Sequence, residues 1–356
     1  MNRNSTPYSQ LKVFYHPEIL QHLLMGERCN PVYIRIKPTN KCNHNCSYCH
    51  YKNSYLDLDQ FDPKDEIPRE KMLETVDSMS ELGVKGVTFS GGGEPLLYPY
   101  IVETMERVLS KKIDLSIITN GSLLAGDRAK ILSNAKWVRI SIESVNDEEY
   151  CSIRGIKKGS FDILCNNISS FAAIKNERCE LGINVVVNKN NAYQVMEMAK
   201  LMKSLGVNHV KFSPMITNDT KTYHAPFKDD VSKMLEEAQR EYGSDSFKVI
   251  DLYTGDFADS VIFERQYKRC LMKEFICIIA ANCKVYFCQD KAYLSDGVVG
   301  SIEDKSFKEL WLSEETTRLF REFDARKVCK QHCVHDSRNE LLNSFVDMDR
   351  NHINFI

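Results

Sequence analysis

Between residues 32 and 213, short apolar runs alternate with longer stretches of helical periodicity. Runs such as Val32–Lys37 (VYIRIK) and Leu181–Val187 (LGINVVV) are rich in β-branched residues and predict strands. The stretches between such runs place apolar residues three and four positions apart, which predicts helices. Further strands are predicted at Val84–Ser90, Leu115–Thr119, Trp137–Glu143 and Val207–Ser213, and helices at Arg69–Leu82, Pro99–Ser110, Ala125–Asn134, Phe161–Lys175 and Ala192–Leu205.

This alternation predicts right-handed βαβ units around a parallel sheet. Six such units favour an α/β fold of the partial (β/α)6 TIM-like barrel type. The pattern then stops: Thr217–Pro226 is polar and predicted as a loop, and Asp229–Tyr242 as a charged helix. Cysteines crowd from Tyr267 onward and predict a small C-terminal cysteine-rich extension. The expected divisions are an N-terminal segment (1–30), the barrel core (31–225), a connecting segment (226–266), the cysteine-rich domain (267–340) and a C-terminal tail (341–356).

Composition narrows the class of protein. The formal net charge of −2 provides no electrostatic footprint for nucleic acid or an anionic membrane. No apolar run approaches the ~18 residues of a membrane span, and the polar start (MNRNSTPYSQ) is no signal peptide. A cytoplasmic location is therefore expected, where thiols stay reduced. The 13 cysteines then favour metal or redox chemistry over disulfides.

The first cysteine motif follows the first predicted strand. Its spacing is Cys42-x3-Cys46-x2-Cys49. Three close thiolates can hold three irons of a [4Fe–4S] cluster and leave the fourth iron open to another ligand. A structural zinc, with His44 or His50 as fourth ligand, is the alternative.

A glycine-rich turn, Gly91-Gly92-Gly93-Glu94-Pro95, follows the second predicted strand. It lacks the Lys-Ser/Thr of a P-loop, and its carboxylate would repel phosphate. Glycine backbone beside a carboxylate suits an ammonium group instead. With both motifs in place, residues 31–213 resemble the radical S-adenosylmethionine (SAM) superfamily. The resemblance implies a partial barrel that binds SAM at a [4Fe–4S] cluster held by the three cysteines.

The resemblance also implies a SAM pocket. Each of its expected residues follows one of the first four predicted strands, on the face where β/α barrels build active sites. Asn120-Gly121 as an ordinary turn, Ser141 as a packing residue and Arg154 as a surface arginine remain alternatives. The expected roles are Tyr48 near the adenine, Gly91, Gly92, Gly93 and Glu94 at the methionine amino group, Thr119 and Asn120 near the ribose, Ser141 and Glu143 near the ribose and carboxylate, and Arg154 paired with the SAM carboxylate.

A second cysteine set has the spacing Cys270-x17-Cys288-x40-Cys329-x3-Cys333. It resembles the short twitch form of the SPASM extension of radical SAM enzymes, which implies an auxiliary [4Fe–4S] cluster. The segment Asn282-Cys283-Lys284 departs from that pattern, where a glycine turn is usual. Cys277 and Cys283 leave the choice of ligands open. Zinc, with His332 or His335 as a substitute ligand, and unliganded core thiols are the other interpretations.

The function that follows is radical SAM chemistry. An external one-electron reductant, flavodoxin- or ferredoxin-like, would start it, and the auxiliary cluster favours an oxidoreductase. The expected substrate is a small polar molecule such as a sugar or an aminocyclitol, which would be dehydrogenated. The alternatives are epimerisation or thioether formation on a peptide, with Cys283 or Cys277 as catalytic hydrogen donor, and a non-catalytic zinc or iron–sulfur electron-transfer protein. Weaker candidates for substrate contact are Asp290, Lys291, Tyr293 and His224.

Overall fold

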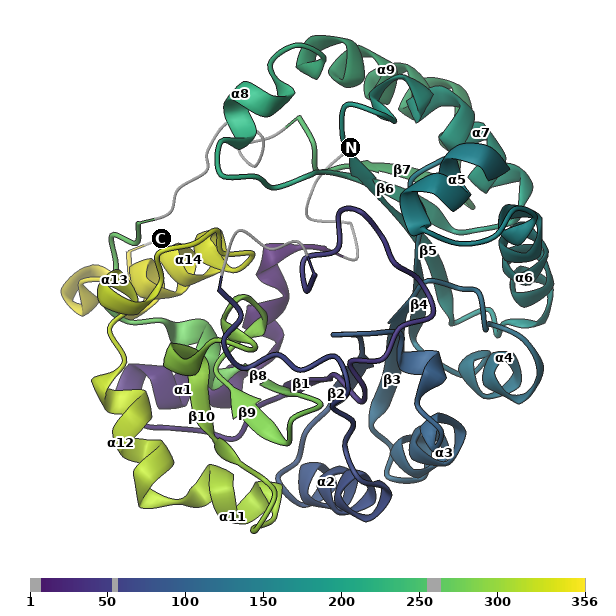
Figure 1. Cartoon of the computed structure of the whole chain (residues 1–356). Coiled ribbons are helices and arrows are strands. Elements are labelled where there is room, and N and C mark those ends of the chain that lie inside the picture. The colour runs from purple at the N-terminus through teal and green to yellow at the C-terminus, as the bar shows by residue number, and fades with distance from the viewer. Residues whose placement is uncertain (1–7, 53–56, 255–263, 356) are drawn as a thin grey trace.

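The computed structural model describes residues 8–52, 57–254 and 264–355. One ten-stranded sheet has the order β10-β9-β8-β1-β2-β3-β4-β5-β6-β7. It curves into an open arc with helices along its outer side (Figure 1). The strands of the arc are β1 (Tyr33–Ile36), β2 (Gly86–Phe89), β3 (Asp114–Thr119), β4 (Trp137–Ser141), β5 (Glu180–Val187), β6 (His209–Pro214) and β7 (Lys248–Asp251), followed by β8 (Ile276–Ile279), β9 (Lys284–Tyr286) and β10 (Val298–Ser301).

Strands β1 to β7 pair in parallel with their neighbours, and helices connect them. The prediction of an α/β fold with a partial TIM-like barrel and a C-terminal cysteine-rich extension is therefore confirmed. The barrel helices are α2 (Arg69–Glu81), α3 (Ile101–Ser110), α4 (Gly126–Leu132), α5 (Asp147–Arg154), α6 (Ser160–Ile174), α7 (Val195–Ser204), α8 (Thr220–His224) and α9 (Lys228–Tyr242), with short 3-10 turns at Pro95–Leu97 and Ala192–Gln194.

The two faces of the sheet differ in character. Along β1, Ile34 and Ile36 are fully buried in the main hydrophobic core, while Arg35 between them is partly exposed. Strand β4 repeats this alternation, with Val138 and Ile140 in the core. Because successive side chains of a strand point to opposite faces, the aliphatic residues face the helices and the polar ones face the barrel interior. The interior is thus lined in part by polar side chains that retain solvent exposure.

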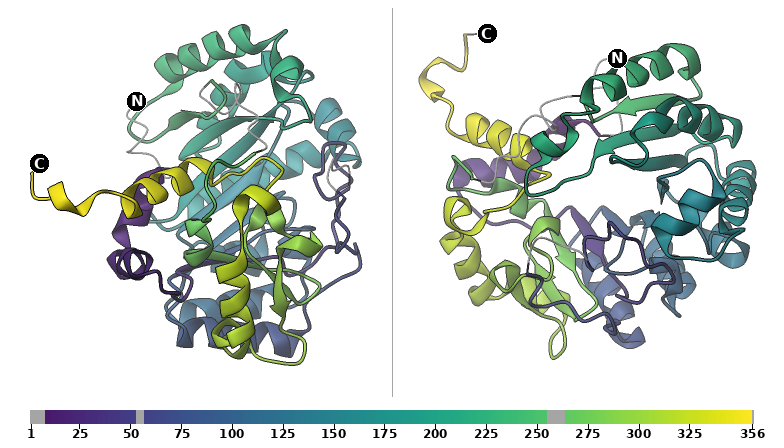
Figure 2. Two further views of the ribbon diagram at one scale, coloured as in Figure 1. Left: turned by 90° about the vertical axis from the view of Figure 1, so that its left-hand side faces the viewer. Right: turned by 45° about the horizontal axis from the view of Figure 1, so that its top comes forward.

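The C-terminal extension is part of the same sheet. Strand β8, formed by the apolar run within Phe275–Ala281, pairs in parallel with β1, and β9 continues antiparallel to β8. The extension ends in helices that lie near the N-terminal helix α1 (Pro17–Met25), as Figure 2 shows. A shared cluster of buried residues, including Leu23 and Leu342, joins the two ends of the chain. The helices are α11 (Phe307–Leu312), α12 (Glu314–Glu322), α13 (Ala325–Val328) and α14 (Asp336–Val346), and the remaining 3-10 turns are Gln10–Tyr15, Leu271–Glu274, Gln289–Lys291, Ser295–Gly297 and Arg350–His352.

Several elements differ from the sequence prediction. The segment expected as a connection, 226–266, supplies α9 and β7, which extend the barrel, and α14 crosses the expected boundary at 340. Helix α8 forms inside the expected loop because Asp219 caps it by accepting from the Thr222 N–H. The domain boundaries stay predictions. Within the described ranges, no helix is both long and apolar enough to cross a bilayer.

Continuity of the sheet makes a testable prediction. Ile279 on β8 is fully buried against the barrel core. Ile279→Ala should lower the free energy of unfolding by about 2–5 kcal/mol in a single urea transition. Ile163→Ala, at a position 56% exposed on α6, should change it by less than about 0.5 kcal/mol. A separate early transition in the Ile279 variant would show that the extension folds independently of the barrel.

Candidate active site

The first cysteine loop follows β1 and leaves its thiols free. Cys42 is exposed, and Cys46 and Cys49 are partly buried. Burial raises the pKa of the Cys42 and Cys46 thiols. The His44 N–H acts to lower the pKa of Cys42, and the Arg154 guanidinium acts to lower that of Cys46. The His44 N–H also donates to Cys42 Sγ at 3.4 Å. The loop therefore offers three thiols beside hydrogen-bond donors that favour thiolates.

The loop rests on the end of α5. The Asn45 N–H donates to Arg154 O at 2.8 Å, and the Ser47 N–H donates to Ile153 O at 2.9 Å. Helix α5 ends at Gly155, whose φ of +59° is left-handed, and a Cβ at Gly155 would lie 3.0 Å from Asn45 O. Glycine is required here for both reasons. The end of β4–α5 thus fixes the position of the cysteine loop.

The three glycines after β2 pack against the chain that leaves β1. Gly93 N–H donates to Thr39 O at 3.0 Å, and Glu94 N–H donates to Lys41 O at 2.9 Å. A Cβ on Gly93 would lie 2.0 Å from Lys41 O, closer than any real contact. The glycines therefore allow two backbone segments to touch. Their expected contact with the SAM amino group stays a prediction.

The Glu94 carboxylate joins the ends of β2 and β3. It is buried and accepts from the Thr119 hydroxyl at 2.6 Å, the Asn120 N–H at 2.7 Å and the Leu96 N–H at 3.0 Å. Burial raises the pKa of Glu94, and the hydrogen bonds from Asn120 and Thr119 act against that rise. Asn120 in turn donates to Asn43 Oδ1 at 2.9 Å. Sequence reasoning missed this bracing between loops.

A buried ion pair lies at the end of β4. Arg154 Nη2 donates to Glu143 Oε2 and to Ser141 O, each at 2.6 Å. Burial acts to lower the pKa of Arg154, but the Glu143 carboxylate raises it well above the usual value. The structure shows Arg154 paired with Glu143, and the expected pairing of Arg154 with the SAM carboxylate stays a prediction.

The pair is not saturated by hydrogen bonds. Glu143 Oε1 and Arg154 Nε are buried without a hydrogen-bond partner among the described residues. The Tyr48 ring lies beside them, 5.8 Å from the Arg154 guanidinium carbon. This place thus offers a carboxylate oxygen, a guanidinium N–H and an aromatic face. Such groups fit SAM, which has a zwitterionic methionine part and an adenine ring.

The second cysteine set comes from three separate segments that meet in space, one of which carries both Cys329 and Cys333. Burial raises the pKa of the Cys288 thiol, and Cys333, Cys270 and Cys329 raise it further. Four such thiols cannot all ionise together without a cation between them. Cys333 Sγ accepts from the His335 N–H at 3.4 Å, which repeats the arrangement of Cys42 and His44.

The donor set fits an iron–sulfur cluster. No three His, Cys, Asp or Glu side chains among the described residues surround one point closely enough for a single ion. A cluster occupies the space between its thiolates, so its ligands lie farther apart than those of one zinc ion. Thiol donors fit an iron–sulfur cluster, and zinc stays the alternative interpretation at both cysteine sets.

Two other cysteines were expected to act as hydrogen donors. Cys277 lies inside β8, fully buried, and burial alone raises the pKa of its thiol. Cys283 lies at the turn between β8 and β9 with a φ of 55°, and burial raises its pKa to about 11. Both thiols belong to the hydrophobic core, so their placement offers no support for the predicted donor role.

His224 was a candidate for substrate contact. Its Nδ1 lies 3.0 Å from the Tyr253 hydroxyl and its Nε2 lies 3.0 Å from Met215 O. Both ring nitrogens are therefore occupied by the fold. A structural role accounts for this histidine.

A polar strip formed by Tyr51, Lys37 and Asp290 extends from the first cysteine loop toward the second set, with Lys37 buried and the other two partly buried. Lys37, at the end of β1, donates to Gly91 O at 3.3 Å and to the Tyr51 hydroxyl. Burial lowers the pKa of Lys37 to about 7, and Asp290 acts in the opposite direction. Tyr51 follows Cys49 by two residues, and Asp290 follows Cys288 by two. The sequence analysis did not single out Lys37. The signal that could have found it is its charge, because it alternates with the buried isoleucines Ile34 and Ile36 along one strand.

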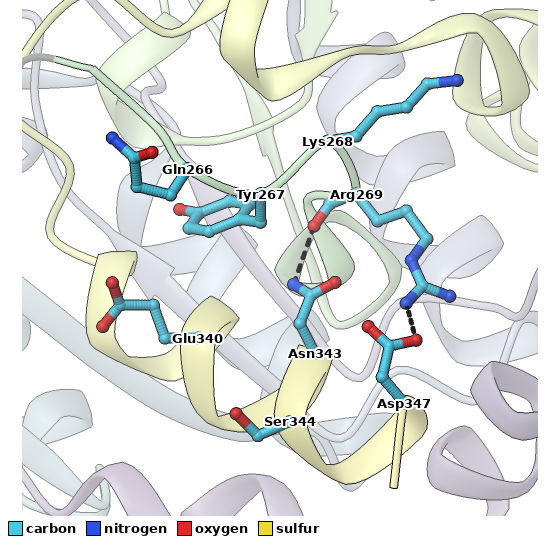
Figure 3. Close-up of a pocket in the computed structure, with 8 residues that line it drawn as sticks. All are labelled: Gln266, Tyr267, Lys268, Arg269, Glu340, Asn343, Ser344 and Asp347. Atoms are coloured by element: carbon cyan, nitrogen blue, oxygen red, sulfur yellow. Dashed lines mark hydrogen bonds and ion pairs between the residues drawn. The ribbon is translucent and has the colours of Figure 1, made fainter. Parts of the chain in front are cut away.

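Two cavities lie outside this strip. One, of about 590 Å³, is bounded by residues 266–269 and by α14, where Asn343 donates to Arg269 O at 3.0 Å (Figure 3). The other, of about 470 Å³, borders the first cysteine loop at Asn43 and His44 and reaches Lys157.

Comparison with known proteins identifies the class. A model of the radical SAM superfamily matches residues 36–193, and a model of the SPASM iron–sulfur cluster-binding domain matches residues 270–334. The chain is thus a radical SAM enzyme with a C-terminal SPASM domain, as its cysteine motifs predicted. These domains imply SAM, a [4Fe–4S] cluster and auxiliary iron–sulfur binding.

Individual relatives are more distant. A GTP 3′,8-cyclase of Limosilactobacillus fermentum is 29% identical over 245 residues, 63% of this chain and 70% of the relative. The antilisterial bacteriocin subtilosin biosynthesis protein AlbA of Bacillus subtilis is 26% identical over 186 residues, 51% of this chain and 39% of its own length. The crystal structure of Streptococcus suis SuiB bound to precursor peptide SuiA has a TM-score of 0.62 at 16% identity, covering 92% of this chain and 77% of SuiB. The last similarity shows a shared fold.

The role of Glu94 can be tested directly. Glu94→Gln should lower the free energy of unfolding by about 1–3 kcal/mol without SAM, because the amide cannot accept all three hydrogen bonds. Glu106→Gln, at an exposed position on α3, should have no effect beyond about 0.5 kcal/mol. Urea unfolding measures both. If the Glu94 variant loses only SAM affinity, the carboxylate is a ligand of SAM rather than a brace.

Proposed function

We propose that this chain holds two iron–sulfur clusters and uses them at one active site. Cys42, Cys46 and Cys49 would bind the cluster that meets SAM. Cys270, Cys288, Cys329 and Cys333 would bind the auxiliary cluster. The proposal is supported by the free thiols of the first loop and by the mutual electrostatic effect of the second set.

Bound together, the first cluster and SAM supply a 5′-deoxyadenosyl radical that takes one hydrogen atom from the substrate when an external flavodoxin- or ferredoxin-like protein provides an electron. The residues of the chain bind and orient. Glu143 and Arg154 would meet the polar groups of SAM with their unpartnered atoms. Glu94 would keep the loops after β2 and β3 in place. The buried surroundings would exclude water from the radical.

The observation that carries the proposal is the strip formed by Tyr51, Lys37 and Asp290. Lys37 is hydrogen-bonded to Tyr51 and interacts electrostatically with Asp290. Asp290 accepts from the N–H of Val334, the residue after Cys333, at 3.0 Å. A substrate beside this strip would have SAM on one side and the auxiliary cluster on the other. The auxiliary cluster that the second set would hold would supply an acceptor for the second electron, and the second proton would leave to solvent, so that the overall change is a two-electron oxidation.

The substrate that we propose is a small polar molecule bound in the barrel, such as a sugar or an aminocyclitol. Its dehydrogenation would make the enzyme an oxidoreductase. The relatives named above are, by their names, a cyclase and a bacteriocin biosynthesis protein, so dehydrogenation stays a prediction.

Peptide modification is the second candidate. SuiB, which shares the fold, is bound to a precursor peptide in its structure, and AlbA is named for bacteriocin biosynthesis. A peptide would need an open path to the strip between the two cysteine sets.

Iron content tests the two-cluster assignment. Anaerobically reconstituted protein should contain about eight irons per chain. Replacing Cys42, Cys46 and Cys49 together by Ala should leave about four irons and abolish release of 5′-deoxyadenosine from SAM under reductant. Replacing Cys165, a partly buried thiol on α6, should leave both unchanged.

Two results would contradict this assignment. Loss of all iron in the triple variant would mean that the second set holds no cluster. Bound zinc without visible iron–sulfur absorbance in the wild type would favour the non-catalytic zinc alternative.

The type of substrate can be separated by isotope transfer. A substrate labelled with deuterium at the reacting carbon should deliver deuterium to 5′-deoxyadenosine. We expect transfer from a small polar substrate, with the product 2 mass units lighter than the corresponding unlabelled substrate after two-electron oxidation. If deuterium were transferred from a deuterated peptide and from no small molecule, the peptide-modifying alternative would be established instead.

A further inference from the structure

Three basic side chains from separate strands point into the barrel. Arg35 lies on β1, Arg139 on β4 and Lys211 on β6. In each strand the residues on either side belong to the core that faces the helices, so the basic side chain faces the interior. Figure 1 shows β1, β4 and β6 along the arc that surrounds this interior.

These cations are close enough to repel one another. Burial lowers the pKa of Lys211 well below its ordinary value, and Arg139 and Arg35 lower it further. Burial also lowers the pKa of Arg139, and the charge of Arg35 lowers it further. The Nε atoms of Arg35 and Arg139 are buried without a hydrogen-bond partner in the described residues. The set thus carries unsatisfied donors as well as like charges.

Nearby groups do not balance the set. Asp290 acts on Arg35, but it also faces Arg265 and Lys37. Glu180 is hydrogen-bonded to His209 Nδ1 at 2.9 Å. The Tyr8 ring lies 4.8 Å from Lys211 Nζ, and the Tyr8 side chain also lies against Arg139. Across residues 8–52, 57–254 and 264–355, no ion pair within 4.0 Å involves Arg35, Arg139 or Lys211.

Like charges held together in a partly buried place without counter-ions destabilise a fold. We propose that the interior of the barrel binds the oligophosphate group, a diphosphate or triphosphate, of a small-molecule substrate. A single carboxylate would balance one of the three cations, whereas a diphosphate carries enough charge for all of them. The two guanidinium groups also match the geometry of phosphate oxygens.

The location suits a substrate of the proposed enzyme, on which this inference rests. Lys37, which touches the glycine loop at Gly91 O, follows Arg35 by two residues on the same strand. The basic set therefore lies about 7 Å deeper in the barrel than the loops expected to hold SAM. A phosphate group bound there would direct the rest of the substrate toward SAM and the strip of Tyr51, Lys37 and Asp290.

Binding of inorganic pyrophosphate tests the inference. We would titrate it into the anaerobically reconstituted full chain without SAM or reductant and measure the heat of binding. The wild type should bind it, more weakly at higher salt. Arg139→Gln and Lys211→Met should each weaken binding at least ~10-fold. Lys200→Gln, at an exposed position on α7, should bind as the wild type does.

Thermal unfolding distinguishes a ligand-binding role of Lys211 from a purely structural one. Without pyrophosphate, Lys211→Met should unfold at a higher temperature than the wild type, because a buried polar amine without an ion-pair partner is replaced by an apolar side chain. Pyrophosphate should raise the unfolding temperature of the wild type and of Lys200→Gln, and much less that of Lys211→Met. A lower unfolding temperature of Lys211→Met without ligand would show that Lys211 stabilises the fold instead.

Two further outcomes would overturn the inference. One is that the wild type does not bind pyrophosphate, or that the wild type and the three variants bind it equally. The other is binding of a glutamate-rich peptide that depends on Arg139 and Lys211 while pyrophosphate does not bind, which would indicate an acidic peptide substrate. Pyrophosphate binding needs no SAM cleavage, so the two proposals can fail separately. Pyrophosphate binding without 5′-deoxyadenosine release would refute only the proposed function. Release of 5′-deoxyadenosine without pyrophosphate binding would refute only this inference.

Discussion

Parallel pairing of β8 with β1 is the interaction on which the arrangement of this protein depends. It places β1 between β8 and β2 in the middle of the sheet. The chain that leaves β1 carries Lys37 and the first cysteine loop, and the chain that leaves β2 carries the three glycines. The hairpin after β8 leads to Cys288 and Asp290. Strand β9 runs antiparallel to β8, so Cys288 lies near Val32 and Tyr33, toward the start of β1. Because parallel neighbours end at the same edge of a sheet, the first cysteine loop and the glycines meet at the carboxyl edge.

Burial of charge around this edge is costly, and the structure compensates it unevenly. Glu94 is fully compensated, because two N–H groups and a hydroxyl donate to its carboxylate. Glu143 and Arg154 neutralise each other but leave one atom of each without a partner. Among the described residues, no ion pair balances Arg35, Arg139 or Lys211 of the basic interior, and the four thiols of the second cysteine set lie together. The uncompensated places are where ligands are proposed, since a folded chain keeps such costs mainly where binding repays them.

Local signals succeeded where the chemistry is contained in one short segment. The spacing of Cys42, Cys46 and Cys49 and the GGGEP turn were enough to predict a radical SAM domain, which the family comparison confirms. Most strands and helices from Tyr33 to Pro214 follow from periodicity because each buries one face, but helix α5 was not predicted. Strand β8 was not predicted, since a fully apolar run of that length shows no alternation. Strand β7 was missed because it is short, with only four residues.

Pairings between distant residues could not be predicted from the sequence. Arg154 was expected at the SAM carboxylate, and only the folded chain shows Glu143 beside it. The basic interior requires three strands to bring Arg35, Arg139 and Lys211 together, although each looks ordinary in its own strand. The sequence by itself determined the elements and the two cysteine motifs, because periodicity and spacing act over a few residues. The tertiary structure decided which charges meet, because electrostatic interaction depends on distance in space and on burial.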